Sequence, residues 1–398
     1  MMPSVLPKPS GPFHVGCTDI VTCYGKNRSL FRLFYPAQHN SQNYPTPWVS
    51  DEEYITGLIK FAKLSNFSWI ARYFFSGRFM PATYNANLDV KDASNKLPVV
   101  LFSHGLGSNR TTYSSVCLEM ASHGSVVASV EHADESASAT YYLEKPNDGN
   151  EKPIKKWINF LVVNSGDPNE HAIRNKQVHQ RANDCSKVLD HLIELNQGTL
   201  NNVFAGVDLL QFKDKLDLDR CSVVGHSFGG GTAITVLSKD KRFKGALGLD
   251  SWLYPLDKDV YKKVSAVPIL FINAETFQWP ANVASMRKLD ADALGVEAER
   301  KIVTIKKAVH MTHSDILMFF GWNWFTKHLP MLGGCDPVEL IQASHQIMMA
   351  FMGKHLGLPC GQDLEQLSKI KDAFIVGSNV ELDEERVKQS KEALRASL

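Results

Sequence analysis

Short hydrophobic runs recur through the middle of the chain, separated by polar, helical or glycine-containing segments. Each run has the length and composition of a buried β-strand and is too short for a helix of its own. The expected strands are residues 97–103, 125–130, 221–224, 246–249, 269–272 and 302–305. Hydrophobic residues at helical spacing predict helices over residues 111–123, 174–196 and 230–239. Gly124 and Gly198 follow the first two helices and are expected to end them.

Strands that alternate with helices are typical of an α/β protein, in which a mostly parallel central sheet carries helices on both faces. No internal repeat and no linker-like stretch divides the chain, so we expect a single catalytic domain over residues 1–398. The polar stretch 145–156 is expected to lie at the surface. The charged tail from about residue 380 is expected to be a solvated helix or a frayed end.

Composition and charge narrow the classes of function. Of 398 residues, 44% are hydrophobic and 21% are charged, which excludes a disordered chain. Lys and Arg number 43 against 42 Asp and Glu, so no basic field is present to hold nucleic acid. The seven cysteines lack the CxxC spacing of zinc sites, and their odd number does not favour a disulfide framework.

The N-terminal residues lack the basic and apolar pattern of a signal peptide, and Met2 stands where an N-myristoylated protein has glycine. No stretch reaches the ~18 uninterrupted apolar residues that span a bilayer. The sequence therefore predicts a cytoplasmic protein that meets membranes only at their surface.

The segment Gly225-His226-Ser227-Phe228-Gly229 follows an expected strand and opens an expected helix. This is the GxSxG pattern in the strand–turn–helix context of a nucleophile elbow. Serine at so sharp a turn has strained backbone angles, and Gly225 and Gly229 leave room for it. The N-terminus of the following helix favours developing negative charge. We therefore expect Ser227 to be a nucleophile; the alternative is a glycine-rich turn that only packs the helix on the strand.

A serine nucleophile needs a base, and in this kind of fold the histidine comes last in chain order. His310 follows the expected strand 302–305 through a short turn, at the edge where an open sheet presents its functional loops. His310 is therefore the expected base. We expect the neighbouring His313 to pack or to be solvated beside it.

The base in turn needs a carboxylate that orients it. Asp250 comes directly after the expected strand 246–249 and is the expected acid. Asp257 and Asp259 lie in a polar segment and are expected to be solvated. Any single aspartate can instead be a helix cap or a turn residue.

Hydrolysis of an ester also needs two backbone N–H groups that stabilise the oxyanion. One is expected from Phe228, the residue after the nucleophile. The other is expected from Leu106, in the glycine-containing loop 104–107 after the strand 97–103. The alternative for this loop is an ordinary turn.

Eight short segments between about residues 11 and 360 share their pattern with one enzyme family. They are residues 31–36, 102–107, 174–178, 225–230, 249–252, 277–282, 309–310 and 354–358. Through these segments the chain resembles the platelet-activating-factor acetylhydrolase family of serine-dependent, calcium-independent lipases. The chain departs from the family pattern at Ser251, where alanine is usual, and at His313, which lies close to the base. It shows neither the signal peptide of the secreted branch nor the myristoylation site of the intracellular branch.

The resemblance implies an α/β-hydrolase fold and hydrolysis of the sn-2 acetyl or oxidatively shortened acyl ester of platelet-activating factor and related phospholipids. Carried over by position, it makes Ser227 the nucleophile, Asp250 the acid and His310 the base, with Leu106 and Phe228 at the oxyanion hole. No metal or organic cofactor is implied. The alternatives are a general short-chain carboxylesterase and a catalytically idle hydrolase-fold protein that binds lipid.

Two aromatic segments are candidates for contact with a lipid surface. The segment from Ile55 to Phe75 combines aromatic residues with three basic residues and has no acidic residue. The segment from Ile316 to Phe325 is rich in aromatic residues and follows the proposed base closely. The alternatives are a helix that covers the sheet for the first segment and a core helix for the second.

Overall fold

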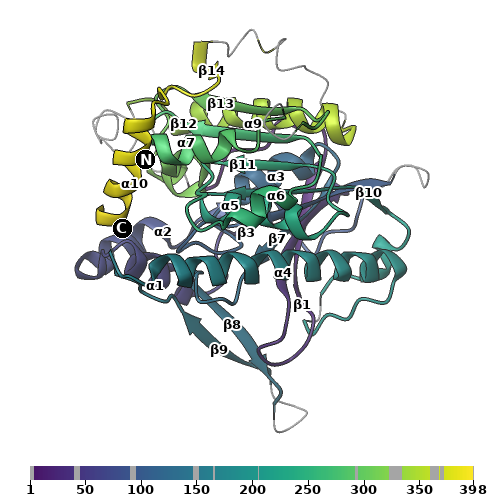
Figure 1. Cartoon of the computed structure of the whole chain (residues 1–398). Helices are drawn as coiled ribbons and strands as arrows, with labels where there is room; N and C mark the ends of the chain where they lie inside the picture. The colour runs from purple at the N-terminus through teal and green to yellow at the C-terminus, as the bar shows by residue number, and fades with distance from the viewer. Residues whose placement is uncertain are drawn as a thin grey trace. The chain divides into compact units, whose positions relative to one another are not determined.

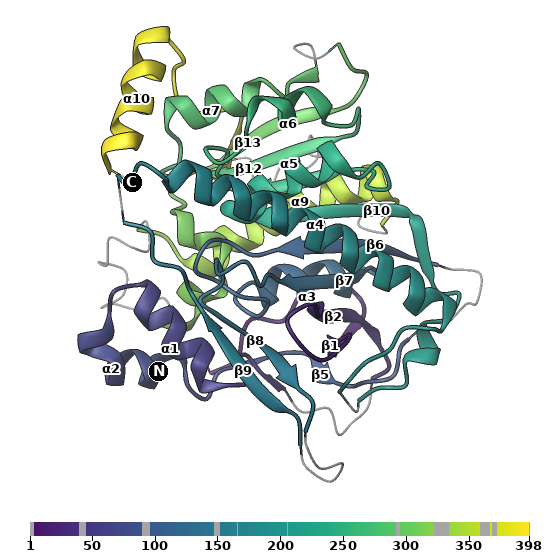
Figure 2. The same cartoon turned by 60° about the horizontal axis from the view of Figure 1, so that its bottom comes forward.

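The structure of the chain, a computed structural model, is shown in Figures 1 and 2. It describes residues 4–39, 45–89, 96–146, 152–164, 166–204, 206–291, 295–321, 334–358, 367 and 372–397. The chain divides into two compact units. Unit 1 contains Met1–Leu161 and Asn183–Cys221, and unit 2 contains Val162–Ala182 and Ser222–Leu398. The single domain expected over residues 1–398 stays a prediction.

Unit 1 contains a mixed sheet with the strand order β6-β7-β2-β1-β5. The strands are β1 (His14–Val21), β2 (Leu30–Ala37), β5 (Thr83–Tyr84), β6 (Leu97–Ser103) and β7 (Val126–Glu131). β6 and β7 run parallel, whereas β2 runs antiparallel to both of its neighbours. The buried helix α3 (Ser114–Ser122) packs against β1, β2 and β7.

Smaller elements complete unit 1. The short strand β3 (Thr46–Pro47) pairs with β4 (Phe79–Met80), and β8 (Ala139–Glu144) pairs with β9 (Ile154–Asn159). The helices are α1 (Glu52–Phe61), α2 (Ser68–Phe75) and the 3-10 turns η1 (Ser65–Phe67) and η2 (Leu209–Phe212). The long helix α4 (Glu170–Gln197) begins in unit 2 and ends in unit 1.

Unit 2 carries the parallel strands that place the candidate site. Strands β11 (Ala246–Leu249), β12 (Ile269–Ala274) and β13 (Arg300–Ile305) are parallel neighbours, and β11 also pairs with the last residues of β10 (Leu216–His226). The short strand β14 (Phe374–Val376) runs antiparallel to β13. The helices are α5 (Phe228–Lys239), α6 (Lys258–Lys263), α7 (Pro280–Arg287), α9 (Pro337–Leu356) and α10 (Glu384–Ser397), with 3-10 turns η3 (His310–His313) and η4 (Asp315–Phe320). Figures 1 and 2 show α5 and α7 on one face of these strands and α9 on the other.

The predicted parallel α/β architecture is confirmed, and most predicted elements are present. Strands 97–103 and 246–249 coincide with β6 and β11, and Gly124 and Gly198 take the positive φ angles, 96° and 77°, that end helices. The antiparallel strands β1 and β2 were not predicted. Both are buried almost throughout, yet polar residues such as Asp19 and Arg32 interrupt their hydrophobic runs.

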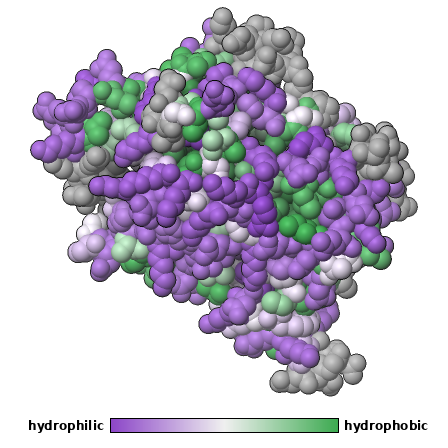
Figure 3. Space-filling view, turned by 45° about the vertical axis from the view of Figure 1, so that its right-hand side comes forward, coloured by the Kyte–Doolittle hydropathy of each residue, from purple (hydrophilic) through white to green (hydrophobic). Residues whose placement is uncertain are grey.

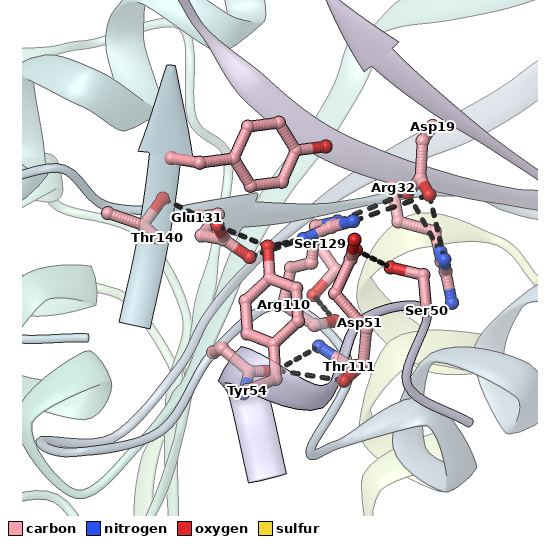
Figure 4. A network of polar contacts seen from close by, with 12 residues as sticks. Asp19, Arg32, Ser50, Asp51, Tyr54, Arg110, Thr111, Ser129, Glu131 and Thr140 are labelled. Atoms are coloured by element: carbon pink, nitrogen blue, oxygen red, sulfur yellow. Dashed lines mark hydrogen bonds and ion pairs between the residues drawn. The ribbon is translucent and has the colours of Figure 1, made fainter. Parts of the chain in front are cut away.

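The buried polar residues of unit 1 form an ionic network (Figure 4). Arg32 donates two hydrogen bonds to the Asp19 carboxylate, at 2.9 and 2.8 Å. Arg110 joins this carboxylate to Glu131, whose Oε2 lies 2.6 Å from the arginine Nη1. The Tyr54 hydroxyl of α1 donates to Glu131 at 2.8 Å and also contacts Arg110. The network therefore links α1, the three strands β1, β2 and β7, and the segment that follows the loop 104–107.

Hydrophilic side chains predominate on the face shown in Figure 3. None of the helices in the described part of the chain is long and apolar enough to cross a membrane.

Candidate active site

Ser227 lies at the turn between β10 and α5, with φ 55° and ψ −116°. These angles lie in a region that non-glycine residues rarely adopt, so the surrounding structure must hold the turn. A Cβ at Gly225 would lie 2.1 Å from the Gly229 carbonyl oxygen, so glycine is required there. The Ser227 N–H donates to the Leu249 carbonyl at 2.9 Å, which fixes the turn against β11. The strand–turn–helix geometry expected for the motif is present.

Asp250 directly follows β11 and is almost completely buried. Its Oδ1 accepts the backbone N–H of Ala274 at 2.5 Å. Its Oδ2 lies 3.1 Å from Nδ1 of His310. Because a carboxylate only accepts, the histidine donates from Nδ1, and its Nε2 remains available as a proton acceptor.

His310 opens the turn η3 and keeps 27% of its side chain exposed. Its ring stacks on Phe277, with ring centroids 3.5 Å apart. Its carbonyl oxygen accepts from Nε2 of His226, the residue before Ser227, at 3.1 Å. His226 therefore connects the serine turn to the loop that carries His310. Among the described residues, the Ser227 hydroxyl has no hydrogen-bond partner, and catalytic hydrogen bonds often tighten only when substrate binds.

Burial dominates the electrostatics of this group. It raises the pKa of Asp250 to about 7, against the opposing effect of the nearby His313 imidazole. It lowers the pKa of His310 to about 3, so the imidazole is neutral at neutral pH. A neutral imidazole can take a proton, as a general base must.

The second histidine, His313, is 1% exposed, and its Nε2 lies 3.9 Å from Oδ2 of Asp250. Its Nδ1 lies 3.3 Å from the Ser344 hydroxyl, and burial lowers its pKa to about 3. It is packed, as one of the two sequence-based expectations had it. His310 is the histidine that both contacts Asp250 within hydrogen-bond distance and reaches the surface.

Asp257 and Asp259, the alternative acids, lie elsewhere. Asp257 caps α6 through the N–H groups of Asp259 and Val260 and pairs with Nε2 of His179 at 2.9 Å. Asp259 is exposed. Neither contacts a candidate base at the serine turn among the described residues.

Among the described residues, the His, Cys, Asp and Glu side chains that lie close enough together to hold a metal ion belong to this same group. One ligand atom each of His226, Asp250 and His310 lie within 4.8 Å of one another. Two imidazoles and a carboxylate are ligands that zinc accepts. Within this group Oδ2 of Asp250 already pairs with Nδ1 of His310, and Nε2 of His226 donates to the His310 carbonyl, an arrangement that suits proton transfer.

The two expected oxyanion donors lie in different units. Phe228 is the first residue of α5, where the helix leaves N–H groups without intrahelical partners. Leu106 lies in unit 1, within the turn after β6, and is the least buried residue of that turn. The phenyl ring of Phe61, at the end of α1, lies against Gly107 of the same turn.

Two residues at the site had no role assigned from the sequence. His226 was seen only as part of the motif, and Phe277 only as part of the family resemblance. Their contacts with His310 join segments far apart in the chain, 84 residues in the case of His226. No spacing pattern signals such a contact.

Comparison with known proteins adds to this geometry. A sequence model of the family described as platelet-activating factor acetylhydrolase, isoform II, matches residues 2–373. The platelet-activating factor acetylhydrolase of Gallus gallus is 36% identical over 391 residues, covering 95% of this chain and 90% of the relative. The platelet-activating factor acetylhydrolase of Bos taurus is 36% identical over 388 residues, covering 95% of this chain and 83% of the relative. A ferulic acid esterase from Streptomyces cinnamoneus superposes with a TM-score of 0.62 at 18% identity, covering 94% of this chain and 99% of that chain, and shares the α/β-hydrolase fold.

Proposed function

The chain belongs to the platelet-activating factor acetylhydrolase family, and we propose that Ser227, Asp250 and His310 perform its ester hydrolysis. The substrate is the sn-2 acetyl or shortened acyl ester of platelet-activating factor and related phospholipids. The products are a lysophospholipid and a short carboxylate. The hydrogen bond between Asp250 and His310, beside the strained serine turn, is the observation that supports this mechanism most directly.

The reaction follows two steps in this proposal. The Ser227 Oγ attacks the ester carbonyl while Nε2 of His310 takes its proton, and Asp250 stabilises the imidazolium through Nδ1. The tetrahedral intermediate collapses, His310 returns the proton to the leaving oxygen, and the lysophospholipid departs. Water then attacks the acyl-enzyme, again with His310 as base, and releases the carboxylate and free Ser227.

The N–H groups of Phe228 and Leu106 are proposed to stabilise the oxyanion in both steps. Support for Phe228 comes from its position at the first turn of α5, whose N-terminus also favours negative charge. Support for Leu106 comes from its partial exposure at the turn after β6, where its neighbours are buried. No metal or organic cofactor takes part in the proposed steps.

Contact with a lipid surface is proposed through α2 and the end of α1. Trp69 and Tyr73 of α2 are 72% and 74% exposed, and Phe61 and Leu64 nearby are also exposed. Aromatic residues exposed on an amphipathic helix suit the interface between water and lipid. Arg72, on the same helix, pairs with Glu52 at 2.8 Å.

The second segment expected at the lipid surface has less support. Leu317, Met318 and Phe319 of η4 are buried, so this half belongs to the core. The remainder of the segment, from Trp322 to Phe325, lies outside the described residues. A cytoplasmic location stays a prediction from the sequence, and cell fractionation tests it.

The direct test is release of acetate from platelet-activating factor with calcium chelated, beside a long-chain phosphatidylcholine and a simple acetate ester. We expect selective cleavage of the acetyl phospholipid, lost in Ser227→Ala while lipid binding persists. Cleavage of the simple ester alone would indicate a general carboxylesterase. Lipid binding without any Ser227-dependent turnover would indicate an idle lipid-binding protein.

A further inference from the structure

Unit 1 contains a second serine, histidine and aspartate in hydrogen-bond contact. Nδ1 of His132 lies 3.0 Å from Oδ2 of Asp184, and its Nε2 lies 2.9 Å from Oγ of Ser103. Ser103 ends β6 and, like His132, is fully buried. A fully buried hydroxyl cannot meet a substrate, so these residues do not form a second nucleophilic site. Their arrangement calls for another role.

The backbone N–H of His132 connects these hydrogen-bonded residues to His104. The His132 N–H donates to Nε2 of His104 at 3.4 Å, and Nδ1 of His104 lies 2.8 Å from the Gly105 carbonyl oxygen. An N–H can only donate and a carbonyl can only accept. His104 is therefore a neutral imidazole with its proton on Nδ1.

This hydrogen bond fixes the direction of the next peptide group. The Gly105 carbonyl accepts from Nδ1 of His104 and also from the Ser108 N–H at 3.3 Å. The described peptide bonds are trans, so the N–H of Leu106 points away from the Gly105 carbonyl. Among the described residues, no acceptor takes a hydrogen bond from the Leu106 N–H. The amide is thus held in one direction and left free for an external acceptor.

The rest of the turn is held separately from this amide. Gly107 has φ 67°, and its N–H donates to the Ser136 carbonyl at 2.8 Å. The Ser138 N–H donates to the Ser108 carbonyl at 2.8 Å. These bonds fix the far side of the turn, whereas the carbonyl between Gly105 and Leu106 is held by Nδ1 of His104, at 2.8 Å, and by the longer bond from the Ser108 N–H.

We propose that His104 is a positioning residue that directs the Leu106 N–H at the oxyanion, and that Ser103, His132 and Asp184 hold it there. The proposal rests on the oxyanion role proposed above for Leu106. His104 itself touches no reacting atom. No proton or electron moves through the second chain of hydrogen bonds, whose function is to fix the position and tautomer of two buried rings.

Two substitutions at position 104 separate positioning from packing. Asn places a donor nitrogen where His has Nδ1, whereas Gln places it where His has Nε2. His104→Asn therefore keeps a donor for the Gly105 carbonyl, and His104→Gln loses it. We expect His104→Gln to lower kcat for a simple acetate ester by up to about 10²-fold with KM unchanged, since loss of a whole oxyanion donor lowers kcat by about 10²–10³-fold. We expect His104→Asn to recover most of this loss.

A transition-state analogue gives a readout that a loss of packing would not mimic. A trifluoromethyl ketone adds to the serine and places an oxyanion in the hole, whereas the ground-state ester does not. Its inhibition constant is expected to rise in His104→Gln by the same factor as kcat/KM falls. The control is the same substitution at a histidine away from the turn, His179→Gln, which keeps a donor for Asp257 in place of Nε2 and is expected to leave both quantities unchanged.

The outcomes are distinct. Wild-type kcat in both position-104 variants, equal losses in both, or a loss confined to KM would each overturn the positioning role. Ser227→Ala is measured in parallel with the same ester. If it keeps turnover, the proposed mechanism fails and the oxyanion role of Leu106 fails with it. If it is inactive, the His104 result stands by itself.

Discussion

Asp250 and His310 are joined by a hydrogen bond of 3.1 Å between Oδ2 and Nδ1, formed between loops that follow two different strands. Asp250 has a second bond, to the Ala274 N–H, that holds its carboxylate in place. The pair thus fixes both the position of the imidazole and the nitrogen that carries its proton. Because burial shifts the pKa of each partner, the pair has measurable consequences for pH as well as for rate.

Asp250→Asn tests the orientation of the base. An amide in place of the carboxylate presents a donor to Nδ1 and favours the tautomer whose Nε2 cannot accept a proton. We expect kcat to fall by about 10⁴-fold, with KM little changed. A fall of less than tenfold would contradict the assignment of Asp250. Asp259→Asn, at an exposed position away from the base, is the control.

The wild-type rate should depend on the ionisation of Asp250. With its pKa raised to about 7 by burial and that of His310 lowered to about 3, the base is already neutral when the carboxylate ionises. We expect kcat to rise as pH increases through about 7. A profile of kcat from pH 5 to 9 checks this, and the step should vanish in the residual activity of Asp250→Asn. A flat wild-type profile would argue against a buried, ionised Asp250.

The same raised pKa predicts an effect on stability. Between the unfolded value of 3.8 and about 7, the folded state binds more protons at this carboxyl, so its contribution to stability falls as pH rises. Above pH about 7, where Asp250 is ionised in both the folded and the unfolded state, the loss of stability caused by its buried charge is complete. We expect the Tm of Asp250→Asn minus that of the wild type to be larger at pH 8 than at pH 5. An equal difference at both pH values would contradict the shift.

Gly225→Ala tests the geometry of the serine turn. The added Cβ would lie 2.1 Å from the Gly229 carbonyl oxygen, which forces the backbone to move. A displacement of about 1 Å at a reacting group can lower the rate by about 10²-fold, and we expect a loss of at least that size. The control is Gly245→Ala, whose Cβ would have 3.5 Å to its nearest neighbour, the Pro268 carbonyl. Equal activities in the two variants would refute this account of the turn.

The buried ionic network of unit 1 predicts an unequal effect of two substitutions. Arg110→Met leaves two carboxylates without their shared cation and is expected to lower the free energy of unfolding by about 3–5 kcal/mol. Tyr54→Phe removes one hydroxyl that binds Glu131 and is expected to lower it by about 1–3 kcal/mol. Denaturant titration of both variants measures the difference. A larger loss of unfolding free energy in Tyr54→Phe than in Arg110→Met would show that the Tyr54 hydroxyl of α1 stabilises the network more than Arg110 does.

The proposed lipid contact predicts a change in partitioning without a change in chemistry. In Trp69→Ser/Tyr73→Ser, affinity for phospholipid vesicles is expected to fall tenfold or more, since burial of one large apolar side chain contributes about 1.5–3 kcal/mol. Turnover of a simple soluble ester should not change. Leu210→Ser, at another exposed apolar residue of unit 1, is the control. Unchanged vesicle binding in the double variant would place the lipid contact elsewhere.

Much of the site could be predicted from the order of residues. The elbow at Ser227 depends on a strand, a sharp turn and a helix that are consecutive in the chain, so a local pattern is enough to find it. Asp250 and His310 could be nominated because each follows a strand of a parallel sheet. The buried strands β1 and β2 could not be predicted from the sequence. Their hydrophobic runs are interrupted by polar residues such as Asp19 and Arg32, whose buried partners lie elsewhere in the chain.

The linear pattern thus accounts for the α/β architecture, the nucleophile and the family, since these follow from local periodicity and short motifs. The choice of the base and the tautomer of the histidine before Gly105 depend on the tertiary structure. His310 is distinguished from His313 by its contact with Asp250 and by its exposed edge. The tautomer of His104 follows from a backbone N–H that lies 28 residues away in the chain. Burial, pKa and the identity of a hydrogen-bond partner depend on which distant segments pack together, and neighbouring residues do not encode them.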